Sequence, residues 1–278
     1  MLSFDFDYYQ PKSIEEAVQL YHALDREEKH PLYYSGGTEI ITLGRLDLVY
    51  TNAVIDIKAI PECEVLGTQE GYFVTGSGLT LTAIEENNGF PLLSKAASGV
   101  ADHTARNKIT VGGNICGQIF YREAVLPFLL TDSKIVAAGM NGVRTEHIMS
   151  LFNKTLRLKK GELLVQLQTE KRYLNVPYRC VKKRPQWDTG YPLVTIAAIK
   201  AEEGIRVAFS GVSPFPFRSR EMEKALNENG RIKERILASL QHLPKPVLDD
   251  VEGSSEYRLF VLKNTLFDIL RELEEDHR

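Results

Sequence analysis

The sequence predicts an α+β fold in two parts, residues 1–172 and residues 173–278. Three observations support this prediction. In the first part, short apolar runs typical of strands alternate with segments of helical periodicity. Two Gly-Gly pairs, at residues 36–37 and 112–113, each follow one of these apolar runs directly. The second part begins with a predicted strand hairpin and continues in sequence that is mostly helical in pattern.

The first 60 residues predict a βαβ-like opening. Ser13 and Glu16 form a capping box that starts a helix, and apolar residues at positions 14, 18 and 21 mark one face of it. Residues 32–34 predict a strand that enters the first Gly-Gly turn. A second helix is expected over residues 39–46, and a short buried strand over residues 54–57.

The rest of the chain predicts further elements in order. Residues 64–78 alternate as a hairpin with Gly71 at its turn, and Thr80 starts a capped helix. The remaining expected helices cover residues 90–97, 124–130, 219–227, 232–240 and 255–275. The remaining expected strands cover residues 133–138, 162–168, 193–200 and 205–212. The boundary between the two parts falls near residues 169–177.

Composition excludes several classes of function. The chain has 278 residues with 34 basic and 37 acidic side chains, and it has no long basic run, so a nucleic-acid or membrane-surface partner is not expected. No apolar run reaches the ~18 residues that span a bilayer, and the first residues do not match a signal peptide. Three separated cysteines and six scattered histidines predict a cytoplasmic protein without a disulfide framework or a metal site, and they are too few to ligate an iron–sulfur cluster alone.

The two Gly-Gly pairs are the candidate functional features. Glycine lets a backbone turn with positive φ or approach a ligand closely, and amides exposed in such a turn favour phosphates. Thr38 and Asn114 follow the two pairs and could bond to a phosphate or to the opposite loop. Each pair alone is more often an ordinary turn, and neither has the GxGxxG spacing of a Rossmann fingerprint. Together they suggest two loops that close on one pyrophosphate.

Five stretches of the chain carry a resemblance to a known family: YQPKSIEEA at residues 9–17, SGGTE at 35–39, IDIKAIPE at 55–62, RNKITVGGNIC at 106–116 and GVSPFP at 211–216. These stretches follow one another in the same order as in the family. In them the chain resembles the flavin-carrying subunit of the molybdenum hydroxylases, the group that includes xanthine dehydrogenase and carbon monoxide dehydrogenase. The resemblance implies a PCMH-type FAD-binding domain over residues 1–172. It implies a C-terminal α/β domain like that of the carbon monoxide dehydrogenase flavoprotein over residues 173–278.

The resemblance also implies which residues contact FAD. Backbone amides of residues 32–39 and 109–113 are expected to hold the pyrophosphate, and Asn114 and Ile115 to continue that wall. Leu163 falls where a residue lining the adenine or ribose is expected, although a core strand residue is an equal alternative. Tyr178 falls where an aromatic or basic side chain reaches the cofactor. The full expected set is Leu32, Tyr33, Tyr34, Ser35, Gly36, Gly37, Thr38, Glu39, Ile40, Ile109, Thr110, Val111, Gly112, Gly113, Asn114, Ile115, Glu123, Leu163 and Tyr178.

The chain departs from the family pattern at two places. After the second loop, where the family has a small-Pro-x-x-Asp run, this chain has QIFYRE, and Glu123 is the expected ribose contact. The lysine that the family places near Cys180 is displaced to Lys182 or Lys183. Trp187 falls where the family turns toward the flavin ring, and boundary packing is its alternative role. Residues 32–41 contain no histidine that could tether FAD, so non-covalent FAD is expected.

The implied function is electron transfer. The resemblance implies that FAD receives electrons from an iron–sulfur subunit and a molybdopterin-binding large subunit and passes them to NAD+ or another acceptor. No catalytic side chain is assigned, because the cofactor does the redox chemistry. Xanthine or another purine is the expected substrate of the assembly. The alternatives are the flavoprotein subunit of a carbon monoxide or aromatic-substrate hydroxylase, or a scaffold that has lost FAD.

Overall fold

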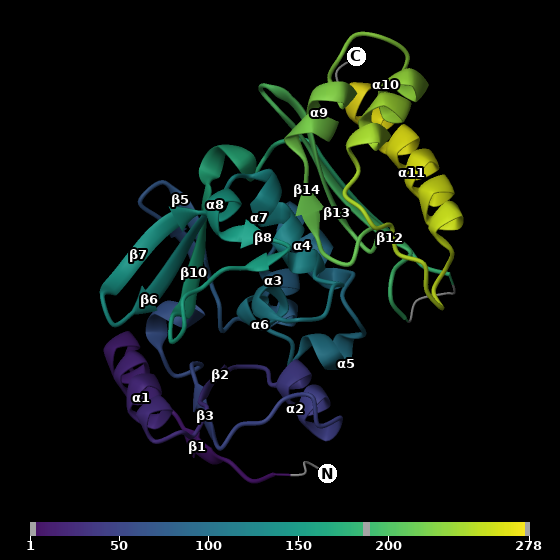
Figure 1. Ribbon diagram of the computed structural model, residues 1–278. Helices are drawn as coiled ribbons and strands as arrows, with labels where there is room; N and C mark the ends of the chain where they lie inside the picture. The colour runs from purple at the N-terminus through teal and green to yellow at the C-terminus, as the bar shows by residue number, and fades with distance from the viewer. Residues whose placement is uncertain (1–3, 186–189, 276–278) are drawn as a thin grey trace.

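The computed structural model describes residues 4–185 and 190–275. Its N-terminal unit is a small parallel sheet in the order β1-β3-β2, with α1 and α2 in the connections (Figure 1). The bounds are β1 Asp7–Tyr9, α1 Ile14–Arg26, β2 Leu32–Tyr34, α2 Thr38–Arg45 and β3 Ala53–Asp56. The predicted N-cap is confirmed, since the Ser13 side chain accepts from the amide of Glu16, but the predicted capping box is not complete, because the Glu16 carboxylate accepts from the amide of Lys12 and not from that of Ser13.

A five-stranded antiparallel sheet follows, in the order β4-β5-β10-β6-β7. Its strands are β4 Leu66–Gln69, β5 Tyr72–Gly76, β6 Lys134–Gly139, β7 Gly142–His147 and β10 Leu163–Glu170. Short helices connect the strands: α3 Leu81–Asn87, α4 Pro91–Ser98, α5 His103–Arg106, α6 Val111–Cys116, α7 Leu126–Leu130 and α8 Ile148–Leu151, with η1 Pro61–Glu64 and η2 Glu123–Val125. A two-stranded ribbon, β8 Phe152–Asn153 with β9 Thr155–Leu156, completes this region.

The C-terminal part is a four-stranded antiparallel sheet, β11-β12-β13-β14, with helices packed on it. Its strands are β11 Tyr178–Lys183, β12 Val194–Ala201, β13 Gly204–Ser210 and β14 Phe217–Arg218. Its helices are α9 Arg220–Leu226, α10 Ile232–Ser239 and α11 Ser255–Glu275, with η3 Lys171–Tyr173 before the sheet and η4 Leu240–His242 after α10. No described helix is both long enough and apolar enough to span a bilayer.

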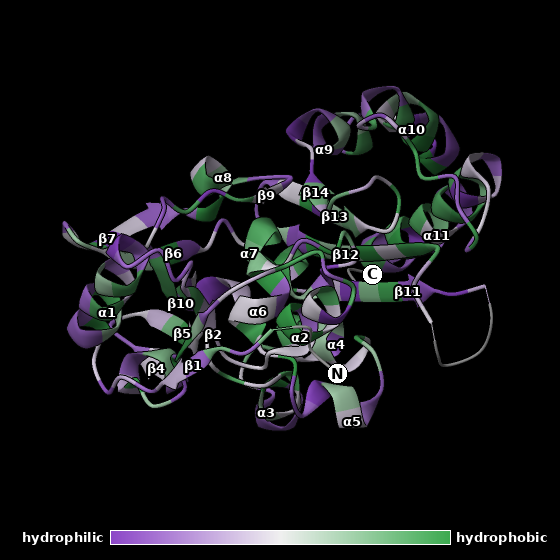
Figure 2. Ribbon diagram, turned by 60° about the horizontal axis from the view of Figure 1, so that its bottom comes forward, coloured by the Kyte–Doolittle hydropathy of each residue, from purple (hydrophilic) through white to green (hydrophobic). Residues whose placement is uncertain are grey.

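The C-terminal sheet is buried on both faces. Along β12, Ala197 and Ile199 belong to the core of the first part, whereas Ile196 and Ala198 belong to a second core formed with α9, α10 and α11. This alternation is the two-residue period of a strand. Figure 2 shows α7, which lies against β12 and β13, as a largely hydrophobic helix. The apolar core therefore continues from the first part into the second.

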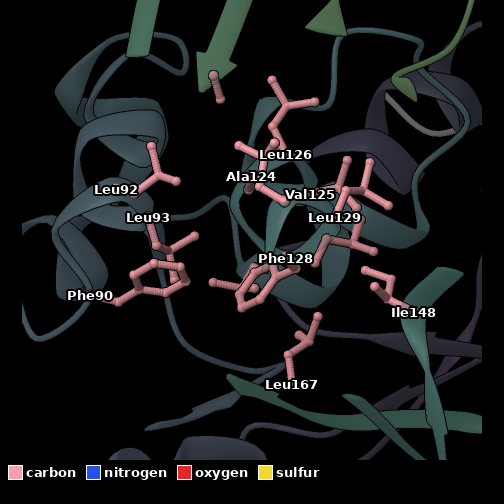
Figure 3. Packing of buried hydrophobic residues seen from close by; sticks show 14 of the residues in the cluster. Phe90, Leu92, Leu93, Ala124, Val125, Leu126, Phe128, Leu129, Ile148 and Leu167 are labelled. Carbon is pink, nitrogen blue, oxygen red and sulfur yellow. The ribbon is translucent and has the colours of Figure 1, made fainter. Parts of the chain in front are cut away.

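Helices α4 and α7 form the centre of the first core. Phe90, Leu92 and Leu93 at the start of α4 face the buried side chains of α7 (Figure 3). The rings of Phe90 and Phe128 meet edge to face, with their centroids 6.1 Å apart. All five residues of α7 are buried, which confirms the prediction of a buried helix in this region.

The second Gly-Gly pair is the main local correction. The sequence predicted that both pairs follow strand-like segments, but residues 103–106 form α5 and the second pair lies in the first turn of α6. The apolar run at residues 109–111 makes only one isolated bridge, between Thr110 and Thr80. Strands β1, β7, β8, β9, β11 and β14 were also not predicted.

Candidate functional site

The first Gly-Gly pair connects β2 to α2 as the sequence predicted. Gly37 is the N-cap residue of α2 and has a left-handed backbone, with φ of 70°. This positive φ favours glycine, and a β-carbon there would also lie 2.2 Å from the hydroxyl oxygen of Tyr34, whose ring would have to move. The first N–H groups of a helix have no partner within it, and glycine offers no side chain to cap them. This helix N-terminus therefore favours an anion.

The two predicted loops touch each other. The backbone of Gly36 lies so close to the carbonyl oxygen of Lys108 that a β-carbon at Gly36 would stand 1.8 Å from it. Lys108 immediately precedes the stretch that leads into α6. The predicted closeness of the two loops is therefore confirmed, and it is achieved by backbone packing.

The amides of the second loop are already paired, contrary to the expectation that they are free to hold a pyrophosphate. The amide of Val111 donates to the Leu79 carbonyl at 2.9 Å, and that of Gly112 donates to the Ser77 carbonyl at 2.8 Å. The amide of Gly113 donates to the Thr110 hydroxyl, which caps α6. Because the residues before α3 satisfy this helix N-terminus, the second loop serves as a wall that supports the first.

Asn114 and Ile115 also face the protein interior. The Asn114 side-chain oxygen accepts from the amide of Ala124 at 3.2 Å, and Asn114 is only 7% exposed. Ile115 is fully buried in the first core, with Ile109 packed against that core. The expectation that Asn114 bonds a phosphate is replaced by an internal role, in which it ties α6 to the segment that carries Glu123.

The first loop retains an unpaired polar group. The Ser35 hydroxyl oxygen is buried and has no hydrogen-bond partner among the described residues. A buried hydroxyl without a partner is costly, and a ligand oxygen at this position would satisfy it. Together with the uncapped start of α2, this group makes residues 35–38 fit the diphosphate of a dinucleotide cofactor.

Other residues of the first stretch are structural. Tyr33 donates from its hydroxyl to the Gly161 carbonyl at 2.9 Å and stacks on Tyr21, and burial raises its pKa above the ordinary value. Leu32 and Ile40 are half-buried, and Thr38 is exposed at the start of α2. The Glu39 carboxylate accepts from the amides of Gln118 and Ile119, so it holds the segment after α6 and not a ligand.

An open cleft of about 610 Å³ lies where α4 and α5 of the first part meet β11 and β12 of the second. Glu123 and Lys182 join the two parts in this cleft through an ion pair of 2.6 Å, with side chains only 3% and 11% exposed. The Lys182 ammonium also donates to the Gly99 carbonyl at 2.7 Å. Because the Glu123 carboxylate is used in this pair, its expected role as a ribose acceptor is not seen. The lining residues are Lys95, Ala96, Ser98, Gly99, Ala101, Asp102, Arg106, Glu123, Cys180, Val181, Lys182, Arg184 and Thr195.

The two isolated site predictions in the later sequence have different outcomes. Leu163 is 2% exposed and packs in a core with Ala17 and Val165, which fits the alternative of a core strand residue. Tyr178 is half-buried at the start of β11, the strand that contributes Cys180 and Lys182 to the cleft. Burial raises the pKa of the Cys180 thiol to about 12, so this thiol is not a nucleophile at neutral pH. Trp187 lies outside the described residues.

An aromatic contact between the two parts was not predicted from the sequence. Tyr121 stacks on Tyr191 of the second part, with centroids 4.5 Å apart and planes 13° from parallel. Its hydroxyl donates to Asp250 at 3.3 Å, and burial raises its pKa to about 12. The signal for it in the sequence is the bulky QIFYRE run, whose aromatic residues exceed the small residues of the family pattern.

Comparison with known proteins identifies the family. A family described as "FAD binding domain in molybdopterin dehydrogenase" matches residues 4–169. The chain belongs to this family. It is therefore an FAD-binding flavoprotein of the molybdenum hydroxylase group, as the sequence motifs indicated.

Similar proteins extend over nearly the whole chain. The glyceraldehyde dehydrogenase medium chain of Sulfolobus acidocaldarius is 26% identical, over 93% of this chain and 95% of the relative. The carbon monoxide dehydrogenase medium chain of Hydrogenophaga pseudoflava is also 26% identical, over 91% of each chain. The xanthine dehydrogenase FAD-binding subunit of Escherichia coli O157:H7 is 25% identical, over 97% of this chain and 96% of the relative.

A solved structure of carbon monoxide dehydrogenase from Hydrogenophaga pseudoflava has the same fold. Its matching chain superposes with a TM-score of 0.86 at 23% identity, and the match covers 98% of both chains. The predicted α+β fold, with a flavin-binding domain and a further C-terminal domain, is therefore confirmed.

Proposed function

We propose that this chain is the FAD-carrying electron-transfer subunit of a xanthine or purine dehydrogenase. The observation that carries the electron-transfer role is the family's FAD-binding domain over residues 4–169, in which the start of α2 remains open to an anion. FAD bound there would supply the exchange of electrons between a two-electron donor and its acceptor. The chain itself binds and orients the cofactor.

The residues of the first loop would hold the diphosphate. The Ser35 hydroxyl, which is buried and has no partner among the described residues, would donate to a phosphate oxygen, and the amides at the start of α2 would add further donors. Gly36 and Gly37 allow the ligand to approach the backbone. No histidine lies in residues 32–41, which supports non-covalent attachment.

The cleft between the two parts is our candidate for the redox end of the cofactor and for its electron acceptor. Its volume of about 610 Å³ is within the range of ligand sites, ~300–1,000 Å³. The Lys182 ammonium and the Arg184 guanidinium line it, and Arg184 donates to the Gly99 carbonyl at 2.9 Å. The Lys182 charge is offset by Glu123, so the Arg184 guanidinium is the cation that suits an anionic group such as the phosphates of NAD+.

Partner chains would deliver the electrons. The described residues hold no group of three or more metal-ligating side chains, and the three cysteines are too few for a cluster. Relatives carry names such as "medium chain" and "FAD-subunit", which describe parts of larger enzymes. We propose an iron–sulfur subunit and a molybdopterin-binding large subunit as the partners of this chain.

The purine substrate is the most specific element of the proposal. It is supported by the FAD-binding subunit of the Escherichia coli xanthine dehydrogenase, but relatives named for carbon monoxide and glyceraldehyde are equally similar. The substrate would bind on another chain, so the test must include the partners. Co-purification followed by assays with xanthine, carbon monoxide and aldehydes distinguishes the candidates, and reduction of FAD only by a non-purine substrate contradicts the purine assignment.

The cofactor role can be tested on the chain alone. We expect purified protein to be yellow, with flavin absorbance bands, and to lack purine hydroxylation until partner subunits are added. Robust purine oxidation by the isolated chain would overturn the electron-transfer role. Protein that stays colourless after incubation with FAD would favour the alternative of a scaffold.

A further inference from the structure

A line of polar contacts crosses the small N-terminal sheet and ends at the first glycine loop. On β1, the Tyr8 hydroxyl donates to the carboxylate of Asp56, at the end of β3. Asp56 is 1% exposed, and its carboxylate pairs with the Lys58 ammonium at 2.6 Å. The Lys58 ammonium in turn donates to the Ser35 carbonyl at 2.9 Å. Side chains from β1 and β3, and Lys58 just after β3, therefore contribute to fixing one peptide group of the loop that follows β2.

Fixing the Ser35 carbonyl also fixes the amide of Gly36. The two groups belong to one planar trans peptide, in which the C=O and the N–H point in opposite directions. With the carbonyl held toward Lys58, the Gly36 N–H is directed to the other side of the loop. The Lys108 carbonyl packs against Gly36 and blocks any side chain there. The orientation of this amide is therefore held by Lys58 and by the second loop.

Lys58 acts mainly by holding the Ser35 carbonyl in place and not by its charge, because Asp56 offsets that charge. The buried carboxylate of Asp56 accepts from both the backbone amide and the ammonium of Lys58, at 3.0 and 2.6 Å. The carboxylate offsets much of the lysine charge near the loop. The ammonium also lies 5.2 Å from the centre of the Tyr34 ring, the ring that lies against Gly37. Lys58 thus contacts the Ser35 carbonyl, which precedes Gly36, and the Tyr34 ring, which packs against Gly37.

We propose that Lys58 is a positioning residue for the cofactor diphosphate, which orients the Gly36 amide through the Ser35 carbonyl. The inference rests on the proposed placement of the FAD diphosphate at residues 35–38. It adds a residue outside both glycine loops to the binding machinery. The ligand class is a dinucleotide or nucleoside diphosphate, and the flavin ring itself is not required.

The test measures binding without turnover. Apoprotein is titrated with FAD and, separately, with ADP, which has a diphosphate but no flavin. We expect Lys58→Met to weaken binding of both ligands by roughly 10- to 100-fold, the usual effect of losing one or two hydrogen bonds to a charged group. Lys58→Arg keeps a donor and should restore most of the affinity. Lys160→Met is the matched control, because Lys160 pairs with Asp25 at the same 2.6 Å but lies on α1's side of the sheet.

Thermal unfolding of the apoproteins separates positioning from general stability. A positioning role predicts that K58M loses affinity while its apoprotein melts within a few degrees of K160M. Unchanged FAD and ADP affinity in K58M overturns this inference and leaves the proposed function intact. If the unaltered protein binds neither ligand, the proposed cofactor site fails and the inference fails with it. Loss of FAD binding with normal ADP binding contradicts a role at the diphosphate.

Discussion

Gly36 and the Lys108 carbonyl are in direct contact, and a β-carbon on Gly36 would stand 1.8 Å from that oxygen. This contact joins the two Gly-Gly stretches, which the sequence shows only as separate motifs. It explains why the first pair needs glycine at both positions: Gly37 for its positive φ and Gly36 for the space. The contact is the basis of the first prediction.

Gly36→Ala should both destabilise the protein and weaken FAD binding. The new methyl group would force the two loops apart, and overpacking of this kind costs about 1–3 kcal/mol. Urea unfolding and an FAD titration measure the two effects. Gly99→Ala is the control for stability, because a β-carbon there meets its nearest atom at 3.5 Å. Equal stability of G36A and the unaltered protein would contradict the contact.

The Glu123–Lys182 pair should be strongly coupled. Removing only one partner leaves a buried charge, which costs about 3–5 kcal/mol, whereas removing both costs less. We expect Lys182→Met to be more destabilising than the double variant with Glu123→Gln. A double-mutant cycle from chemical unfolding measures this coupling. Additive effects of the two changes would show that the pair does not join the two parts in solution.

The stack of Tyr121 on Tyr191 should contribute a smaller coupling. Aromatic pairs are worth about 0.5–1.5 kcal/mol beyond their buried area. Tyr121→Leu and Tyr191→Leu should therefore show a coupling energy of this size in a cycle. Tyr121→Phe keeps the stack and loses the hydrogen bonds of the hydroxyl to Asp250 and Arg258, which makes it the matched control. Zero coupling would mean that the rings do not stack.

Glu162 should make stability depend on pH. Two hydrogen bonds from the Arg144 guanidinium, at 2.9 and 2.7 Å, lower the pKa of Glu162 below its ordinary value of 4.5. A lowered pKa stabilises the fold above the unfolded-state value, and this contribution disappears as the pH falls through the folded-state value. Glu162→Gln should cost about 1–2 kcal/mol at pH 7. That cost should shrink as the pH falls below 4.5.

The control for this pH effect is Glu170→Gln, because Glu170 pairs with Arg172 where both side chains are well exposed, at 43% and 54%. Exposed pairs contribute about 0–1 kcal/mol. We therefore expect a small change with little dependence on pH. A cost for E162Q that stays constant from pH 7 to pH 3 would contradict the lowered pKa.

FAD should leave the protein completely on denaturation. Residues 32–41 contain no histidine, so the first loop offers no histidine for a covalent link. Precipitation with acid should move all flavin absorbance into the supernatant. Flavin retained in the washed precipitate would show a covalent bond, and its peptide could then be identified by mass spectrometry.

Sequence patterns predicted the fold well wherever the signal is local. The caps at Ser13 and Thr80, the hairpin at Gly71 and the long helix α11 each depend on residues close together in the chain. The role of the second Gly-Gly pair was predicted wrongly because the amides of Val111 and Gly112 donate to the carbonyls of Leu79 and Ser77, distant partners that local pattern cannot reveal, and the amide of Gly113 donates to the Thr110 hydroxyl.

The candidate site was predictable only in part, for the same reason. The first loop was found through its glycines. The roles of Glu39 and Glu123 depend on partners that are distant in sequence, an amide after α6 and Lys182 on β11. A carboxylate that bonds to a ligand and one that joins two chain segments have the same sequence signature. Tertiary contacts decide between these roles.

The two-sided burial of β12 bears on how the protein unfolds. A chain ending at residue 172 would leave the apolar side chains of α4 and α7 facing water where Ala197 and Ile199 now cover them. A C-terminal part on its own would in turn expose Ala197 and Ile199 to water. We therefore expect both parts to melt in a single cooperative transition. Exchange of the C-terminal part among relatives would preserve stability only where side chains of the same size as Ala197 and Ile199 are kept on this face of β12.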